Sequence, residues 1–474
     1  MTSIIKKLVE SYTGMVVAVV GVYFMSRYSA ELFHVVESNQ EGHVLLPLLI
    51  VCVLFVLGGI AHYVTLTNNI PSFVAAIFLG IAARPVLAVI TGEPHVMMAI
   101  VSAAVAYILF SGGLETKWED FKALFLKIFS LSFLGLFATA VLFSSAVYWL
   151  GGMMGYEVSL VTAVLLGAVL ASTDPAALIP VLKDVRFRKG KGGLKDIAIA
   201  ESALTDVTGT LLTFVFVLLI EQHVPFADVA GTYGQVFTLG TASFLFSQIF
   251  WGVVIGGLGY FLLDALHVRK GGEPTNAYAT LRKVLRRTNR TTQEDEEYDA
   301  DTSFFLAVPL LAFVVALLLG GSGYLAAFVV GLLLGTLQNL HKTEAYFGRS
   351  IEAFLKPAIF VILGAMVNPG ELIAYAPIGI VAALVFMFVI RPLAVFLSLS
   401  IWLYNGKRME VRDLLFLSFV RETGAIPAAL LITLVGKGMG DAALVSVGMW
   451  VILATLVIQP PLTPYVARKL GIAD

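Results

Sequence analysis

The sequence predicts an all-α, polytopic membrane protein with about 14 transmembrane helices, and composition is the first observation behind this prediction. Hydrophobic residues make up 58% of the 474 residues and charged residues only 13%. A soluble fold needs about a quarter of its residues to be charged, so most of this surface is expected to face lipid. The formal net charge of -1 offers no basic surface for nucleic acid. The single cysteine, Cys52, excludes a disulfide framework and a thiolate metal site.

Long apolar runs are the second observation. A helix that crosses about 30 Å of hydrocarbon needs roughly 20 apolar residues, and fourteen runs of about this length follow one another along the chain. They lie at 12–36, 44–64, 70–93, 97–114, 123–150, 158–183, 194–220, 235–266, 302–320, 322–340, 350–370, 372–404, 411–436 and 440–463. The first run is the least apolar, so residues 1–43 are expected to form an extra helix and loop before the main membrane domain, 44–463.

The distribution of positive charge is an independent third observation, because cytoplasmic loops carry an excess of lysine and arginine. With the N-terminus in the cytoplasm, all but five of the 31 lysines and arginines fall at or near segments that the fourteen runs place inside. The five others are Arg27, Arg84, Arg391, Arg421 and Lys437. This alternation predicts a multi-pass protein of the cell membrane with both termini in the cytoplasm.

The longest polar stretch, 267–303, is predicted to be a cytoplasmic linker within the membrane domain. It is basic in its first part and acidic in its second part, so a regulatory segment that pairs with the rest of the protein is the alternative. Residues 464–474 are expected to be a short cytoplasmic tail.

Polar side chains inside the predicted spans are candidates for function, since an ionised group at the bilayer centre costs at least about 2.5–3.5 kcal/mol. The sixth run contains Thr173, Asp174 and Pro175. Pro175 lacks an N–H and therefore frees backbone carbonyls about 14 Å from the cytoplasmic end of the helix. Carboxylate, hydroxyl and carbonyl oxygens at this depth suit a hard cation such as Na⁺. A proline kink with a hydrogen-bonded aspartate is the alternative.

The seventh run places Glu201, Ser202, Thr205 and Asp206 on two adjoining faces of one helix. Asp206 is expected about 18 Å from the cytoplasmic end, which is the depth of Asp174 within the error of the boundaries. Burial favours a protonated carboxyl and a bound cation favours an ionised one, so a proton and a cation are expected to compete there. A structural hydrogen-bond acceptor is the alternative for Asp206.

The twelfth run contains Arg391, whose guanidinium stays charged and therefore needs an anion nearby. Glu201 is its expected partner, in a structural ion pair that leaves Asp206 able to titrate. Binding of an anionic substrate is the alternative for Arg391.

The thirteenth run contains adjacent opposite charges, Arg421 and Glu422, which are expected to pair with other helices. Gly424 and Pro427 predict a second local break of the helix there. Lys356, near the start of the eleventh run, is expected to extend its ammonium group toward the membrane surface, with a counter-charge in the core as the alternative.

These motifs together resemble a known family. The Thr-Asp-Pro stretch at 173–175 and the Glu-Ser and Asp positions within 201–206 resemble the monovalent cation:proton antiporters of the sodium/proton exchanger type. The LFSGGLE run at 109–115 and the arginine before proline at 391–392 fit the same family. The resemblance covers roughly residues 44–463, and the last thirteen runs match the family's usual thirteen spans.

The resemblance implies a core domain in which two discontinuous helices cross, a dimerisation domain, and alternating access by an elevator-type movement. It also implies that Asp206 is the exchanged carboxylate, that Asp174, Thr173 and Ser202 supply further ligands, and that Glu201 pairs with Arg391. The transported Na⁺ or K⁺ is accordingly expected at Asp206 and Asp174.

Two positions depart from the family pattern. Thr205 stands where electroneutral members carry asparagine and electrogenic members carry a second aspartate. With one carboxylate at 205–206, we expect one cation to exchange for one proton, with Thr205 beside the bound ion. Ser111 stands where some members carry a carboxylate, so K⁺ stays open besides Na⁺.

The sequence therefore predicts a secondary antiporter, not an enzyme, that exchanges Na⁺, or alternatively K⁺ or Li⁺, for H⁺ and needs no resident cofactor. Its expected partners are these ions, membrane lipid and a second copy in a homodimer, and its expected role is pH homeostasis. An organic-anion transporter of related architecture, using Arg391 or Arg421 for its substrate, is the main alternative. An intramembrane enzyme and a passive channel are less favoured.

Overall fold

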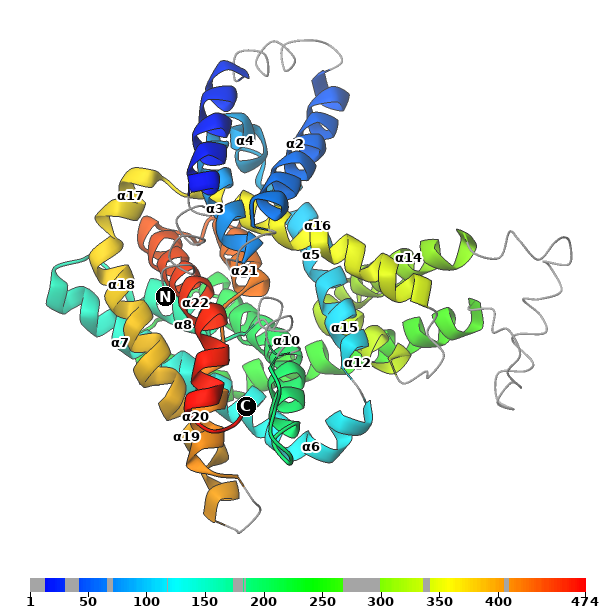
Figure 1. Cartoon of the computed structure of the whole chain (residues 1–474), viewed down its shortest axis with the longest axis vertical. Coiled ribbons are helices and arrows are strands. Elements are labelled where there is room, and N and C mark those ends of the chain that lie inside the picture. Colours follow the sequence, from blue (N-terminus) through cyan, green and yellow to red (C-terminus); the bar gives the residue numbers. More distant parts are fainter. Residues whose placement is uncertain are drawn as a thin grey trace, which may run out of the picture. The chain divides into compact units, whose positions relative to one another are not determined.

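The computed structural model describes residues 13–29, 42–65, 71–116, 118–173, 182, 185–266, 299–335, 342–404 and 409–474. Within these residues the regular structure is helical, apart from an isolated β-bridge between Phe187 and Ala473 (Figure 1). This confirms the prediction of an all-α protein.

Six of the described helical stretches are long and apolar enough to cross a membrane, so the chain is an integral membrane protein. They are Pro94–Glu115, Leu124–Met154, Gly193–Glu221, Leu239–Leu263, Ala376–Leu403 and Ala442–Lys469. Shorter apolar helices accompany them at Leu49–Thr65, Ser72–Ala82, Leu160–Leu170, Phe304–Leu318, Gly323–Leu334 and Ala425–Gly436. Each of the fourteen predicted runs overlaps a described helix, but the number that crosses the membrane and the side of the termini stay predictions.

The chain folds into two compact units. The first consists of Met1–Val105, Phe121–Thr241 and Ala353–Asp474, and the second consists of Ala106–Asp120 and Ala242–Glu352. All the residues that form the candidate site described below belong to the first unit.

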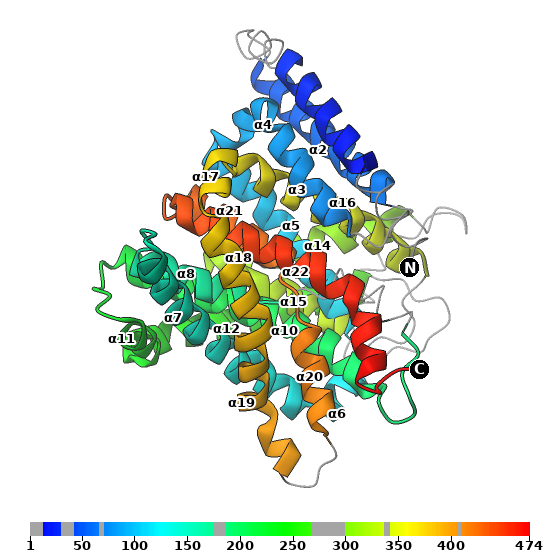
Figure 2. The ribbon, with the colours of Figure 1, turned by 60° about the vertical axis from the view of Figure 1, so that its left-hand side comes forward.

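The first unit contains most of the helices, and within it α18 and α22 lie side by side in both views (Figures 1 and 2). Besides a helix over residues 13–29, its elements are α2 (Gly42–Thr65), α3 (Ser72–Ala82), α4 (Arg84–Thr91), η1 (Leu131–Gly135), α7 (Leu136–Met154), α8 (Leu160–Leu170), α10 (Gly193–Glu221), α11 (Val229–Gly234), η2 (Gln235–Phe237), α17 (Pro369–Ala374), α18 (Ala376–Val385), η3 (Phe386–Ile390), α19 (Arg391–Tyr404), α20 (Val411–Phe419), α21 (Ala425–Gly436) and α22 (Ala442–Lys469). Four of the described helices have residues in both units, namely α5 (Pro94–Glu115), α6 (Trp118–Ser130), α12 (Leu239–Leu266) and α16 (Lys342–Met366).

The second unit is built mainly from α12 (Leu239–Leu266), α14 (Asp299–Leu318) and α15 (Gly323–Leu334). A tight turn separates α14 from α15, as the short polar stretch between their two apolar runs requires. Gly320 adopts a left-handed backbone conformation in this turn, and Ser322 caps α15 by accepting a hydrogen bond from the Leu325 N–H.

Several predicted boundaries are corrected by the helices themselves. The sixth run, 158–183, begins as a helix but α8 ends at Leu170. Residues 299–303 of the predicted linker belong to α14, while 267–298 lie outside the described residues. The predicted tail, 464–474, is helical as far as Lys469, because α22 continues through three prolines, and its cytoplasmic position stays a prediction.

A polar clasp joins the loop before α10 to the start of α20. The Lys191 ammonium lies 2.8 Å from Asp413 Oδ1 and 3.3 Å from Glu410 Oε1. Glu410 and Asp413 also cap the first turn of α20 reciprocally. Burial lowers the pKa of Lys191, but its hydrogen bond and attraction to Asp413, with Glu410 adding to them, outweigh burial and raise that pKa above its ordinary value.

Lys191→Met is expected to lower the free energy of unfolding by about 0.5–1 kcal/mol, because the clasp is partly open to solvent. The raised pKa of Lys191 means that this stabilisation is complete below the ordinary lysine pKa and disappears as pH rises through the raised value. The gap in apparent melting temperature between wild type and variant should therefore stay constant over about pH 6–9 and close above about pH 10.5. Lys189→Met, an exposed change on the same loop, is the control, and an equal loss there would refute a specific clasp.

Candidate functional site

The first break in a helix lies at the end of α8. Its N-terminus is capped by Ser159, which accepts a hydrogen bond from the Thr162 N–H, and the helix then runs only to Leu170. Ser172 and Thr173 are non-helical, fully buried and followed in the sequence by Asp174 and Pro175. In a continued helix the ring of Pro175 would clash with the carbonyl four residues earlier, at Ala171, which accounts for the end of α8 here. Asp174 itself lies outside the described residues, so its predicted role as a ligand stays a prediction.

The helix α10 is continuous and passes directly against this break. A Cβ atom at Gly209 would lie 2.7 Å from the Ser172 Cβ, so only glycine allows the two backbones to approach this closely. The predicted residues Glu201, Ser202 and Asp206 are all buried on α10.

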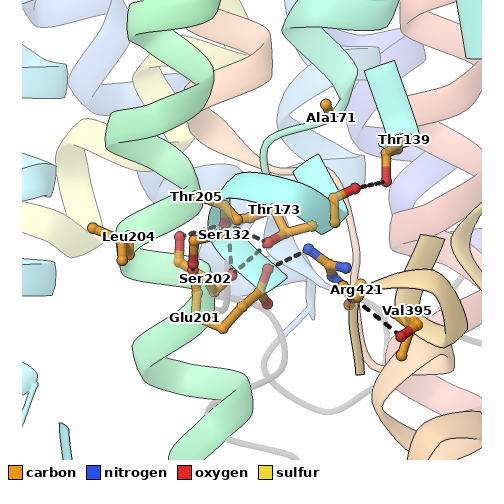
Figure 3. Close-up of polar contacts among 12 residues, drawn as sticks. Ser132, Thr139, Ala171, Thr173, Glu201, Ser202, Leu204, Thr205, Val395 and Arg421 are labelled. Carbon is orange, nitrogen blue, oxygen red and sulfur yellow. Dashed lines mark hydrogen bonds and ion pairs between the residues drawn. The ribbon is translucent and has the colours of Figure 1, made fainter. Parts of the chain in front are cut away.

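Hydroxyl groups join α10 to the break (Figure 3). The Ser202 hydroxyl lies 2.7 Å from the Thr173 carbonyl oxygen, to which it donates, and the Thr173 and Thr205 hydroxyls lie 2.8 Å apart. Ser172 donates to Asp206 Oδ1 over 2.7 Å. The structure therefore brings four of the five predicted ion- or proton-binding residues together, namely Thr173, Ser202, Thr205 and Asp206.

A second break, at residues 420–424 between α20 and α21, carries Arg421 and Glu422. The Arg421 Nη2 group forms an ion pair with Glu201 Oε1, and both side chains are almost fully buried (Figure 3). The predicted partner of Glu201 was Arg391, but the ion pair that the structure shows is with Arg421. Because residues 420–424 are not helical, the Arg421 side chain can reach α10 from the neighbouring span.

Arg391 instead binds the end of α8. Its guanidinium donates hydrogen bonds to the carbonyls of Leu170, Ala171 and Ser172 at 3.1–3.4 Å, and it lies 4.5 Å from the centre of the Phe386 ring. The last carbonyls of a helix lack N–H partners and carry partial negative charge, so a cation is stabilised there. Arg391 therefore replaces hydrogen bonds that α8 loses at its break.

The π-helix η1 holds α10 through one residue that the sequence analysis did not single out. The Ser132 hydroxyl donates to the Glu201 carbonyl at 3.2 Å, and the Ser132 carbonyl accepts from the Thr208 hydroxyl at 2.9 Å. The wider i→i+5 turns of a π-helix loosen the usual ladder and are frequent at functional sites. No short motif marks such a turn, so the sequence carries little signal for Ser132.

Ser132→Ala is expected to lower the free energy of unfolding by about 1 kcal/mol, which is the typical net value of one buried hydrogen bond. Thermal unfolding of the purified protein in detergent measures this loss. Ser145→Ala is the matched control, because the Ser145 hydroxyl is exposed and bonds only to the Val141 carbonyl of its own helix. Equal effects of the two changes would contradict a role for Ser132 in holding α10.

The three remaining predicted site residues lie outside the group of contacts described above. Glu422 is buried beside Arg421, and Lys356 lies half-buried on α16. Ser111 is buried on α5 in the second unit. The functional roles predicted for these three residues stay predictions.

The arrangement defines a class of protein. The continuous helix α10 carries two buried carboxylates, Glu201 and Asp206, and passes the buried hydroxyls after α8 and the helix break that carries Arg421 and Glu422. Breaks at membrane depth are tolerated where they are buried in protein or line a cavity. This is the architecture of a secondary transporter. The sequence profile described as "Sodium/hydrogen exchanger, transmembrane" matches residues 51–269 and 277–469. The chain belongs to this sodium/hydrogen exchanger family, a family of transporters and not of enzymes, which confirms the family predicted from its motifs.

Two relatives are named as potassium antiporters. The chain is 26% identical over 423 residues to the K⁺/H⁺ antiporter NhaP of Alkalimonas amylolytica, covering 87% of this chain and 65% of that protein. It is 26% identical over 359 residues to the K⁺/H⁺ antiporter NhaP2 of Shewanella oneidensis, covering 75% of this chain and 54% of that protein. The chain thus spans between half and two thirds of the length of these relatives.

The sodium proton antiporter MjNhaP1 from Methanocaldococcus jannaschii is similar in structure. It matches with a TM-score of 0.63 and 21% sequence identity, over 89% of this chain and 97% of that chain. This likeness shows a shared fold.

Proposed function

We propose that the protein is a secondary antiporter that exchanges one monovalent cation for one proton across the cell membrane. The observation that carries the proposal is the burial of Asp206 where continuous α10 meets the broken α8, with Ser172 donating to its carboxylate. Such an acid can bind either a proton or a cation, and each disfavours the other. Competition for one carboxylate couples the downhill movement of one ion to the uphill movement of the other.

The surrounding oxygens support a hard monovalent cation as the second ligand. Ser202, Thr173 and Thr205 contribute hydroxyls next to the break, and the Thr173 carbonyl lies among them. Alkali ions prefer such oxygen ligands. Na⁺ is our first candidate, with Asp174 as a further ligand, and K⁺ is the second because the two relatives above are named for it. Li⁺ belongs to the same chemical class.

The arginines support this function over organic-anion transport. Arg391 is held by three backbone carbonyls and Arg421 by Glu201. An anionic substrate would have to displace one of these sets of contacts. Within the described residues, Arg421 Nε and Nη1 and Arg391 Nε have no hydrogen-bond partner, so the rival function depends on these groups. An anion-dependent rise in melting temperature without any response to Na⁺ or K⁺ would favour the rival.

The deciding experiment measures proton flux in proteoliposomes with Na⁺, K⁺ or Li⁺ added separately, with and without an imposed membrane potential. Saturable, cation-dependent proton movement is expected, and its rate should not respond to the potential if one cation exchanges for one proton. Flux that never saturates and needs no counter-ion would indicate a channel instead. A homodimer, alternating access, cytoplasmic termini and a role in pH homeostasis are further parts of the proposal.

A further inference from the structure

The second break needs partners for its own backbone, because an unpaired buried N–H or C=O group is costly. Two side chains of α22 supply them. Thr455 and Gln459 lie one turn apart, so they face the same side of α22, and both are fully buried. They contact the break on either side of Arg421.

Thr455 holds the C-terminal side of the break. Its hydroxyl lies 2.9 Å from the Ile452 carbonyl, to which it donates, and 2.6 Å from the Thr423 hydroxyl. The Thr423 N–H also donates to it over 3.3 Å. The Thr455 hydroxyl donates its single hydrogen to the Ile452 carbonyl. Its oxygen therefore accepts from the N–H and from the hydroxyl of Thr423, which uses its full hydrogen-bonding capacity.

Gln459 holds the N-terminal side of the break. Its Nε2 group donates to the carbonyl of Phe419, the last residue of α20, over 2.8 Å. This carbonyl is one of the helix-end groups without an intrahelical N–H partner. The Gln459 Oε1 atom is buried and has no hydrogen-bond partner within the described residues, which carries a cost. The hydrogen bond to the Phe419 carbonyl is therefore the main stabilising interaction of the Gln459 amide.

We infer that Thr455 and Gln459 are positioning residues that hold the break at 420–424 and thereby keep Arg421 at Glu201. Phe419 and Thr423 are anchored to α22, and Arg421 stands midway between them. A loosened break would let the guanidinium move away from Glu201, which lies five residues before Asp206 on the same helix. The inference rests on the proposed function, because it assigns these residues to the regulation of the same ion site.

The test compares Thr455→Val with Thr455→Ser, which keeps the hydroxyl, and with Gln459→Met. Thr433→Val is the matched control, since the buried Thr433 hydroxyl bonds only to the Ala429 carbonyl of its own helix, α21. Hydrogen–deuterium exchange of the peptide that spans 419–425 measures how firmly the break is held, independently of transport. The pH profile of cation-driven proton flux reads its effect on the ion site.

Thr455→Val should speed amide exchange in the break about fivefold, as expected for the loss of one hydrogen bond. It should also shift the midpoint of the pH profile by about half a unit, because the Arg421 charge is then no longer fixed at Glu201 on the helix that carries Asp206. Gln459→Met should act in the same direction. Thr455→Ser and Thr433→Val should behave like the wild type in both measurements.

Three results would overturn the inference. Unchanged amide exchange in both Thr455→Val and Gln459→Met would show that α22 does not hold the break. Faster amide exchange with an unshifted pH profile would show that the anchoring does not position the ion site. A shift of equal size in Thr433→Val would show a general packing effect. If the wild type exchanges no cation, the proposed function fails, and amide exchange still decides whether α22 anchors the break.

Discussion

Asp206→Asn is expected to reduce cation-driven proton flux to the level of empty liposomes while the protein still folds. The amide has nearly the same shape and can still accept the hydrogen bond that Ser172 donates to Asp206 Oδ1. It can neither take up a proton nor balance the charge of a cation in a site from which water is largely excluded. The loss should therefore appear in transport and not in expression, gel-filtration profile or melting temperature.

Glu221→Gln is the matched control for this change. It alters the same kind of group on the same helix, but Glu221 lies at the exposed end of α10 and pairs with Lys437. Its variant should transport like the wild type. Retention of pH-dependent cation flux by Asp206→Asn would remove the basis of the proposed mechanism, whichever cation drives that flux.

Arg421→Ala and Glu201→Ala are each expected to destabilise the protein by about 3–5 kcal/mol, because each leaves one buried charge without its partner. Both side chains of this pair are 2–3% exposed, so water cannot compensate for the loss. Lower yield of folded protein and a lower melting temperature in detergent are the expected observations.

A double-mutant cycle decides between the observed pair and the pair predicted from the sequence. The double variant Glu201→Ala with Arg421→Ala should lose much less stability than the sum of the single losses, because it leaves neither charge unpaired. Glu201→Ala combined with Arg391→Ala should show a smaller coupling, since Arg391 interacts with Glu201 only through its charge and binds the α8 carbonyls. Coupling of Glu201 to Arg391 and not to Arg421 would contradict the arrangement in the structure.

Much of the fold follows from the sequence, because every helix that crosses a bilayer needs roughly 20 apolar residues. Apolar runs of sufficient length predicted where helices lie, and the bounds of the runs 302–320 and 322–340 placed the turn between α14 and α15. The helix ends were less predictable. Apolar residues continue past Leu170, so hydropathy alone extended the sixth run beyond the end of α8. The π-helices η1 and η3 leave no compositional signal at all.

The residues of the candidate site were easier to predict from the sequence than the pairs that they form. Thr173, Ser202, Thr205 and Asp206 stood out because polar groups are costly within apolar runs, and the structure places them together. The partner of Glu201 depends on how far the second break opens, which one sequence does not reveal. Gln459 and Thr455 were missed because an uncharged side chain in a long apolar helix most often bonds its own backbone.

The two bonds from Ser132 to α10 restrict how an ion could cross the membrane here. They are attached at Glu201 and Thr208, two turns apart along one flank of α10. A twist of that helix about its long axis would break both bonds at once. A movement that carries Asp206 from one aqueous side to the other therefore keeps both bonds only if α10 and η1 shift together.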